Sequence, residues 1–275
     1  MSTALLSIRV TGGPTTVLEI GGLRLIADPT FDAPGEYVSG SGSVLVKTAP
    51  AAVGADEIGA VDAVLLSHDE HPDNLDHSGR DFLATAPVVL TTPSGAGRLR
   101  GALGDAAHGM APWTSFELKR PDRGVLTVTS VPARHGPEGC EPYTGEVVGF
   151  VLTGEELPTV YVSGDNAWLG ATQQVAERFG PIDVALLFAG AARTKLFDGA
   201  LLTLDSAQTA EAARILGVRR AVPVHFNSWR HFSEGEAELR AAFAEAGLTD
   251  RMVLLAPGES VAFTEADLTL PDSAA

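Results

Sequence analysis

The sequence predicts an α/β (α+β) fold, on three observations. Short runs of β-branched and apolar residues recur along the 275-residue chain, and stretches with helical periodicity lie between them. The chain's 30 glycines and 17 prolines punctuate its whole length, as in proteins that join many short strands by turns. Several predicted strands end directly in histidine or aspartate. Because strand ends meet at one edge of a sheet, the fold should bring these polar side chains together.

The first predicted element is a sheet whose strands are joined by hairpins. Three β-type runs, at residues 4–10, 15–20 and 23–27, are separated by Gly-Gly pairs that suit tight turns. Residues 28–43 are rich in Pro, Gly and Ser and too polar to form a core element. We expect a loop here, either a flap beside a site or a plain surface loop.

Strands and helices then alternate. The next expected elements are a strand at 61–67, a helix at 78–84, a strand at 88–92 and a helix at 95–103. The rest of the chain repeats the pattern, with strands at 125–131, 147–153, 159–163, 184–188, 221–224 and 252–255, and helices at 169–179, 206–216 and 234–246. No repeat, low-complexity segment or long linker separates the two β-rich halves, about 1–145 and 146–275. We therefore expect a single domain, residues 1–275.

Composition excludes several classes of partner. Asp and Glu outnumber Lys and Arg by 35 to 19, and the net charge of -16 would repel nucleic-acid phosphates and anionic lipid surfaces. No apolar run approaches the ~18 residues that span a bilayer, and the first residues lack a signal-peptide pattern. Cys140 is the single cysteine, so no intrachain disulfide or thiolate cluster forms. We expect a cytoplasmic protein with a small-molecule substrate, and the oligomeric state stays open.

The segment SHDEHPDNLDH, residues 67–77, is the strongest indication of chemistry. It follows the predicted buried strand VDAVLLS and contains three His, three Asp, one Glu and one Asn. Burying so many nitrogen and oxygen donors is costly without a cation, because the charged groups would be desolvated and would repel one another. The segment therefore predicts a metal site.

Three other strand ends supply donors of the same kind. These are His135 in VPARHGP, Asp165 in YVSGDN and His225 in VPVHFNSW. Glu138 and His231 are outlying candidates; His231 could line a substrate pocket or hold the His225 loop, and we favour the structural role. Imidazole and carboxylate donors without thiolates suit Zn²⁺, Mn²⁺ or Fe, and Zn²⁺ is the commonest of these for hydrolysis.

The order and spacing of these donors resemble the metallo-β-lactamase fold superfamily, in which H-x-H-x-D-H is followed by a His, a bridging Asp and a final His. The resemblance covers nearly the whole chain. The segments ADPTFDAPG, SGDN and PVHFNSW followed by HF are most similar to the ascorbate-6-phosphate lactonase-like and N-acylphosphatidylethanolamine phospholipase-like branch. The resemblance implies a four-layer αββα sandwich with its metal site at the strand ends between the two halves.

Five residues match the family's ligand positions in order: His68, Asp73, His135, Asp165 as the bridging carboxylate, and His225. The pattern departs first where one residue is inserted, since the segment reads H-x-x-H-x-D-N. Either His71 or Glu70 then fills the second position. We take His71, because it stands two residues before Asp73 as the pattern requires.

The second departure is Asn74, which stands where the resemblance implies the sixth ligand, a His. An amide oxygen is a weaker zinc ligand than imidazole, so the second metal should bind less tightly. His77 lies three residues further on, and one helical turn could present it to the same place. Otherwise His77 is a solvated helix residue.

These residues predict a metal-dependent hydrolase with one or two zinc ions per chain. A metal-bound hydroxide would attack an ester, lactone, amide or phosphodiester in a small molecule, with Asp73 orienting it or accepting the proton. Two alternatives stay open. One is a non-catalytic metal-binding or sensor protein, and the other is an iron-dependent oxidoreductase on the same fold.

Overall fold

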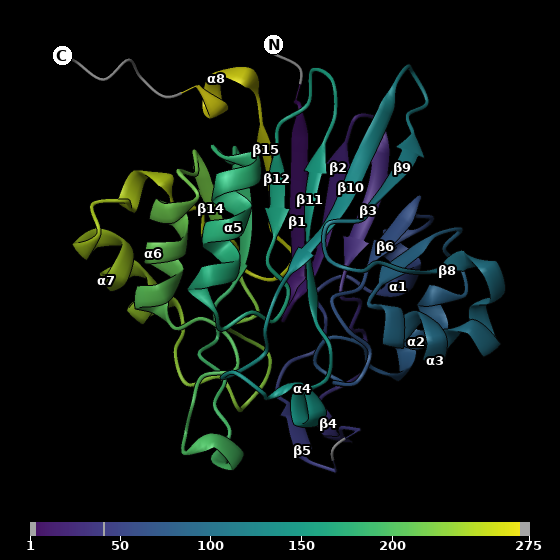
Figure 1. Cartoon of the computed structure of the whole chain (residues 1–275), viewed down its shortest axis with the longest axis vertical. Coiled ribbons are helices and arrows are strands. Elements are labelled where there is room, and N and C mark those ends of the chain that lie inside the picture. Colours follow the sequence, from purple (N-terminus) through teal and green to yellow (C-terminus); the bar gives the residue numbers. More distant parts are fainter. Residues whose placement is uncertain (1–3, 41, 270–275) are drawn as a thin grey trace.

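Two β-sheets lie face to face in the middle of the molecule, and helices cover their outer faces (Figure 1). The computed structural model describes residues 4–40 and 42–269. Both ends of the expected 1–275 domain and residue 41 of the expected loop lie outside the described residues.

The first sheet has seven strands in the order β15-β1-β2-β3-β6-β7-β8. Its first four strands pair antiparallel, and β6, β7 and β8 add in parallel. The strands are β1 (Leu6–Gly12), β2 (Thr15–Ile20), β3 (Leu23–Ala27), β6 (Ala63–Leu65), β7 (Val89–Thr91), β8 (Ala107–Gly109) and β15 (Ser260–Phe263). Side chains alternate between its faces, so Leu25 packs towards the other sheet and Ile26 towards the helices.

The second sheet has six strands in the order β14-β13-β12-β11-β10-β9. The hairpins at one side are antiparallel, and β12, β13 and β14 run parallel. The strands are β9 (Ser115–Lys119), β10 (Val125–Pro132), β11 (Val148–Thr153), β12 (Val160–Val162), β13 (Val184–Phe188) and β14 (Arg220–Val224).

Helices flank the outer face of each sheet. The first sheet carries α1 (Ala55–Ile58), α2 (His77–Leu83) and α3 (Pro93–Leu103), and the second carries α5 (Leu169–Phe179), α6 (Ser206–Ile215) and α7 (Glu236–Glu245). The remaining short helices are α4 (Glu141–Thr144), α8 (Glu265–Leu268) and the 3-10 turns η1 (Gly104–Ala106), η2 (Lys195–Phe197) and η3 (Thr249–Arg251).

Buried apolar side chains form three cores, which the two sheets separate. Leu18 and Phe150 belong to the core between the sheets, Tyr161 and Phe243 to the core under α5–α7, and Phe82 to the core under α1–α3. Helix, sheet, sheet and helix therefore succeed one another, which confirms the predicted four-layer αββα sandwich.

Several segments differ from the expectations, among them β8 and β9, which no expected strand covers. Within the expected loop at 28–43 the chain forms β4 (Gly35–Val38), which pairs with β5 (Val44–Lys47) as a separate hairpin. The strand expected at 252–255 is absent, since Met252 makes only an isolated bridge to Ala221. The last strand is instead β15, whose mostly exposed residues give little hydrophobic signal.

Among the described helices, none has the length and apolar character needed to cross a bilayer.

Candidate metal centre

The loop that follows β6 turns so that its donors face two directions. The chain turns at His71, whose carbonyl accepts the N–H of Leu75 (2.9 Å). Asp69 and Glu70 face Arg98 of α3, whose guanidinium pairs with both carboxylates. The inserted residue is therefore accommodated by turning two acidic side chains to Arg98. Of the two alternatives for the second ligand position, His71 faces the site and Glu70 does not.

The first donor group consists of His68, His71, His135 and Asp165, whose donor atoms all lie within 4.8 Å of one another. Nε2 of His68 lies 2.9 Å from Nδ1 of His71 and 4.0 Å from Oδ2 of Asp165. Nε2 of His135 lies 3.6 Å from the same Oδ2. Ligands bound tetrahedrally at 2.0–2.2 Å are about 3.4 Å apart, so these separations suit one bound ion.

Hydrogen bonds behind the first group fix which ring nitrogen faces inward. Ser67 Oγ donates to Asp28 Oδ2 (2.7 Å) and so accepts the Nδ1–H of His68 (3.0 Å). His135 donates its Nδ1–H to the carbonyl of Leu202 (2.8 Å). Both rings thereby present Nε2 to the group, as supporting contacts do in metal sites. Burial raises the pKa of Asp28 to about 7, although hydrogen bonds from Ser67 lower it.

The second donor group consists of Asp73, Asp165 and His225. His225 Nδ1 lies 2.8 Å from Asp165 Oδ1, and its Nε2 lies 3.3 Å from Asp73 Oδ2. His225 adopts a left-handed backbone conformation (φ 57°), which the hydrogen bond from its N–H to the carbonyl of Gly13 holds in place (2.9 Å). Asp165 belongs to both groups, in the place that the sequence predicts for a bridging carboxylate.

His231 lies beside the second donor group, although its sequence context favoured a structural role. Its Nε2 lies 3.1 Å from Asp73 Oδ2, and its side chain is 23% exposed towards the pocket described below. The signal in the sequence is a second histidine six residues after His225, in the segment HFNSWRHF. The other outlying candidate, Glu138, is exposed and belongs to neither group.

Asn74 and His77 lie in different environments, one buried behind the site and the other exposed to solvent. Asn74 is fully buried and its Nδ2 donates to Asp28 Oδ2 (3.1 Å), while its Oδ1 has no hydrogen-bond partner within the described residues. Its role as a ligand stays a prediction. The side chain of His77 is 83% exposed and pairs with Asp32 (3.0 Å), because Asp76 caps α2 and that helix turns the ring outward. The interpretation of His77 as a replacement ligand is therefore not supported.

In the second donor group, the pKa of each residue is set by its burial and by its oppositely charged neighbours. Burial alone would raise the pKa of Asp73, but hydrogen bonds from His225 and His231 hold it well below its usual value. Burial likewise opposes ionisation of Asp165, and the charges of His225 and His135 lower its pKa. Burial lowers the pKa of His225, yet the two carboxylates outweigh it and raise the pKa to about 10.

The two histidines from the loop after β6 behave in the opposite way. Burial, followed by the neighbouring His71, lowers the pKa of His68 well below its usual value. Burial and the neighbouring His135 lower the pKa of His71 to about 4. Both rings are neutral at pH 7, which is the form that binds a metal.

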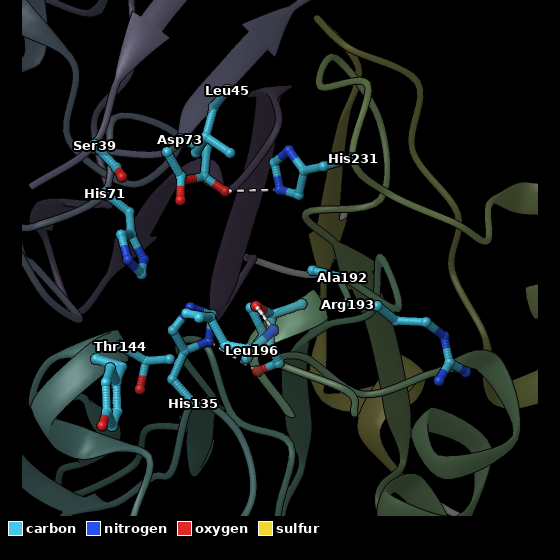
Figure 2. Close-up of a pocket in the computed structure, with 14 residues that line it drawn as sticks. Ser39, Leu45, His71, Asp73, His135, Thr144, Ala192, Arg193, Leu196 and His231 are labelled. Carbon is cyan, nitrogen blue, oxygen red and sulfur yellow. Dashed lines mark hydrogen bonds and ion pairs between the residues drawn. The ribbon is translucent and has the colours of Figure 1, made fainter. Parts of the chain in front are cut away.

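A pocket opens over both groups. His71, Asp73, His135 and His231 line its floor, and in Figure 2 these side chains surround the cavity. Arg193 lies on the rim, but its guanidinium extends away from the histidines and donates to the carbonyl of Gly199 (3.0 Å). The apolar wall consists of Leu45, Tyr143, Ala192, Leu196 and Leu202.

The donor set fits a divalent metal ion. Five of its members are 4% exposed or less, and they include two carboxylates whose pKa values lie below their usual range. Asp73 Oδ1 is buried with no hydrogen-bond partner within residues 4–40 and 42–269. A cation would satisfy this orphaned oxygen and the inward-facing ring nitrogens together. Imidazole and carboxylate donors without thiolate suit zinc, manganese or iron.

Comparison with known proteins shows the family and the fold. Residues 24–226 match the profile of the beta-lactamase superfamily domain, so the chain belongs to that family. A protein named UPF0173 metal-dependent hydrolase from Pyrococcus furiosus is 26% identical over 236 residues, which cover 82% of this chain and 94% of the relative. A relative of the same name from Methanosphaerula palustris is 29% identical over 201 residues, covering 71% and 81%.

Solved structures share the fold. An isothiocyanate hydrolase from Delia radicum gut bacteria superposes with a TM-score of 0.78 at 23% identity, covering 94% of this chain and 99% of that one. A diiron beta-hydroxylase from Streptomyces venezuelae gives 0.66 at 12% identity, covering 96% and 55%. The prediction of a metallo-β-lactamase-fold hydrolase is confirmed at the level of family and fold, and the narrower lactonase-like or phospholipase-like branch stays a prediction.

Proposed function

We propose that this chain is a zinc-dependent hydrolase of a small molecule. One observation carries the proposal: two donor groups share Asp165 and open onto a single pocket. We assign His68, His71, His135 and Asp165 to the first metal position and Asp73, Asp165 and His225 to the second. Asn74 is a further candidate for the second position.

A bound divalent metal would lower the pKa of a water molecule and polarise the electrophile at this floor. The chain's own residues supply the rest. Asp73 is ionised at neutral pH and lies on the pocket floor, so its carboxylate can orient the attacking water and accept its proton. The carbonyl of Leu202 and the hydroxyl of Ser67 keep the rings of His135 and His68 in the required orientation.

The shape of the pocket favours a small substrate. Its volume is about 150 Å³, about the space that a benzene-sized molecule occupies. No guanidinium or ammonium group points at its floor among the described lining residues, because Arg193 turns away. We therefore favour an uncharged ester, lactone or amide over a phosphodiester.

The rim of the pocket favours a substrate that carries an apolar group. Within the described residues, the exposed large hydrophobic side chains are Val38, Val44, Tyr143 and Leu196. Tyr143 and Leu196 line the pocket, and the β4–β5 hairpin carries the two valines next to the lining residue Leu45. An apolar group that extends from the floor would bury this surface.

An iron-dependent oxidoreductase is the second candidate, since the donor set also suits iron and the fold occurs in a diiron beta-hydroxylase. Metal identity in the purified protein separates the two. A sensor without turnover would not need a carboxylate on an open pocket floor. The cytoplasmic location and the lack of a nucleic-acid partner, expected from one cysteine and a net charge of -16, stay predictions.

The test is a hydrolysis screen with protein loaded with zinc, with iron or with no metal. The panel contains nitrophenyl esters of increasing acyl length, lactones, bis(nitrophenyl) phosphate and an aryl isothiocyanate. The last compound is included because the structural neighbour from Delia radicum gut bacteria is an isothiocyanate hydrolase. We expect zinc-dependent turnover of at least one uncharged class, and a fall of 100-fold or more in Asp73→Asn, on the order of general acid–base contributions.

The matched control is His77→Gln, which changes an exposed histidine at the start of α2. It should keep full activity. Equal turnover by Asp73→Asn and the unsubstituted protein, or activity only with iron and an oxidant, would overturn the hydrolase proposal. For the apolar rim, Leu196→Ala should raise KM for long acyl esters and leave acetate esters unchanged.

A further inference from the structure

The second metal position has fewer donors than the first. It contains Asp73, Asp165 and His225, whereas the first has three imidazoles and a carboxylate. Asp165 is shared, and Asn74 stands where the resemblance implies another imidazole. The amide of Asn74 is tied through Nδ2 to Asp28, behind the site. A strong fourth ligand is therefore missing from the loop that follows β6.

His231 reaches the same carboxylate from another part of the chain. Its Nε2 lies 3.1 Å from Asp73 Oδ2, and His225 Nε2 lies 3.3 Å from that oxygen. Two imidazoles thus converge on one carboxylate, with His231 on the pocket side, and Figure 2 shows its ring turned towards Asp73. Its Nδ1 is buried and has no hydrogen-bond partner within the described part of the chain. Within the described residues, the polar contact of the ring is therefore the one that Nε2 makes with Asp73.

The loop that carries His231 is held firmly to the β4–β5 hairpin. The N–H of Arg230 donates to the carbonyl of Val46 (2.9 Å), and the carbonyl of Ser228 accepts the N–H of Thr48 (2.8 Å). A backbone bridge joins Lys47 to the intervening Trp229. Such a loop places its side chains with little freedom, which metal ligands require.

Phe232 positions both imidazoles at once. Its ring centroid lies 4.4 Å from that of His231 and 4.7 Å from that of His225. Contact with this aromatic ring limits the rotation of each histidine. The two rings are consequently prearranged to offer nitrogen atoms to a common centre next to Asp73.

We propose that His231, through Nε2, is the imidazole ligand of the second metal position and supplies what Asn74 cannot. The inference rests on the proposed metal-dependent function and adds a ligand that the sequence pattern does not contain. The second position then has Asp73, Asp165, His225 and His231, a two-carboxylate, two-imidazole set that suits zinc, manganese or iron.

Metal binding by His231→Gln and His231→Ala tests the proposal without relying on turnover. Metal-free protein is titrated with Zn²⁺ in a calorimeter and with Co²⁺ in a spectrophotometer, and thermal melts verify folding. We expect two metal ions per chain in the unsubstituted protein. In both variants the first should bind unchanged and the second roughly 100-fold more weakly or not at all, since even residues that only support a ligand contribute 10–100-fold.

Two controls make the result specific. His77→Gln removes an exposed histidine at the start of α2 and should bind two ions normally. Free imidazole added to His231→Ala should restore the cobalt spectrum of the second position, because it can occupy the vacated space beside Asp73.

Unchanged affinity for the second ion in both His231 variants would overturn the inference and leave the hydrolase proposal intact. Binding of a single ion by the unsubstituted protein would also overturn it. Failure of the unsubstituted protein to bind any metal would remove the proposed function itself.

Discussion

Asp165 is the residue on which the two donor groups depend together. Its Oδ2 faces His68 and His135, and its Oδ1 contacts Nδ1 of His225. It is also 1% exposed, so no water can replace it easily. A change here should therefore affect both metal positions, whereas a change at His225 should affect chiefly the second.

Asp165→Asn should lower both metal content and turnover, because the amide keeps the shape and removes the shared negative charge. We expect less than one metal ion per chain by elemental mass spectrometry and little remaining activity. Glu211→Gln, which breaks a surface pair with Arg214, is the control and should match the unsubstituted protein. Full metal content together with full activity in Asp165→Asn would refute the assignment of this residue.

Protonation of His225 makes the second position sensitive to pH. Its raised pKa of about 10 means that the metal-free protein carries a proton there at pH 7, whereas the lowered pKa of His71, about 4, leaves that ring neutral. Metal binding requires the neutral ring, so filling the second position should release about one proton. Affinity for the second ion should then rise about tenfold per pH unit between pH 6 and 8.5.

Calorimetry in buffers of different ionisation enthalpy counts this proton directly. The first ion should bind with no proton released from His68 or His71 over the same range. Equal proton release for both ions, or no pH dependence of the second affinity, would show that His225 is not a protonated ligand in the metal-free protein.

Residue patterns predicted some parts of the site and not others, for physical reasons. His135, Asp165 and His225 lie within three residues of the ends of β10, β12 and β14, and these strand ends meet at one edge, so local sequence predicted that the three side chains come together; their role as ligands stays a prediction. His231 reaches Asp73 because backbone hydrogen bonds to β5 and the residue after it hold its loop in place. A local sequence pattern does not encode such a long-range contact. The helical-turn argument for His77 failed because Asp32 and the start of α2 turn its ring to solvent.

A buried ion pair anchors the β4–β5 hairpin to the rest of the fold. Nζ of Lys47 lies 3.0 Å from Oδ2 of Asp76, and their side chains are 2% and 0% exposed. Asp76 also caps α2 by accepting the N–H of Gly79. The hairpin carries Leu45 of the pocket wall, so this pair links the wall to the loop of the metal ligands.

Lys47→Met should destabilise the protein by about 3–5 kcal/mol, because it leaves the buried carboxylate of Asp76 without its partner. Chemical denaturation of the metal-free protein measures the change. Arg240→Met breaks an exposed pair with Glu236, whose side chains are both 60% exposed, and should cost only about 0.3–0.5 kcal/mol. Similar costs for the two variants would mean that the buried pair does not anchor the hairpin.

The β4–β5 hairpin is an element that the sequence did not predict. Residues 28–43 read as a polar loop, yet Gly35–Val38 pairs with Val44–Lys47 and is fixed from outside by Asp76 and Trp229. β15 was missed for a related reason, since its pairing with β1 stabilises it and its own residues are mostly exposed. By contrast, β2, β13 and α5 were predicted with the bounds that the structure has. In these elements the spacing of the buried apolar residues is itself enough to indicate a strand or a helix.

Bound metal ions should contribute to the folding stability of the whole protein. The donors come from loops after β6, β10, β12 and β14, so bound ions would cross-link both sheets at one edge. A ligand at 100 times its Kd stabilises the native state by about 2.7 kcal/mol. For a chain of this size that corresponds to a rise in Tm of roughly 5–10 °C.

Thermal melts with and without a chelator, at a fixed protein concentration, test this expectation. Restoring Zn²⁺ should restore the Tm, and Asp165→Asn should show a much smaller difference between the two conditions. A Tm unaffected by chelator in a protein shown to lose its metal would mean that the ions do not link the sheets.

We propose that two metal ions bind at the shared edge of the sheets and that Asp165 is a ligand common to both positions. Anomalous diffraction from crystals of the purified protein, recorded above and below the zinc absorption edge, tests it most directly. We predict two peaks, one within bonding distance of His68, His71, His135 and Asp165 and one within bonding distance of Asp73, Asp165, His225 and His231. No peak at this edge after zinc is supplied, or peaks only on surface residues, would show that the two donor groups are not metal sites.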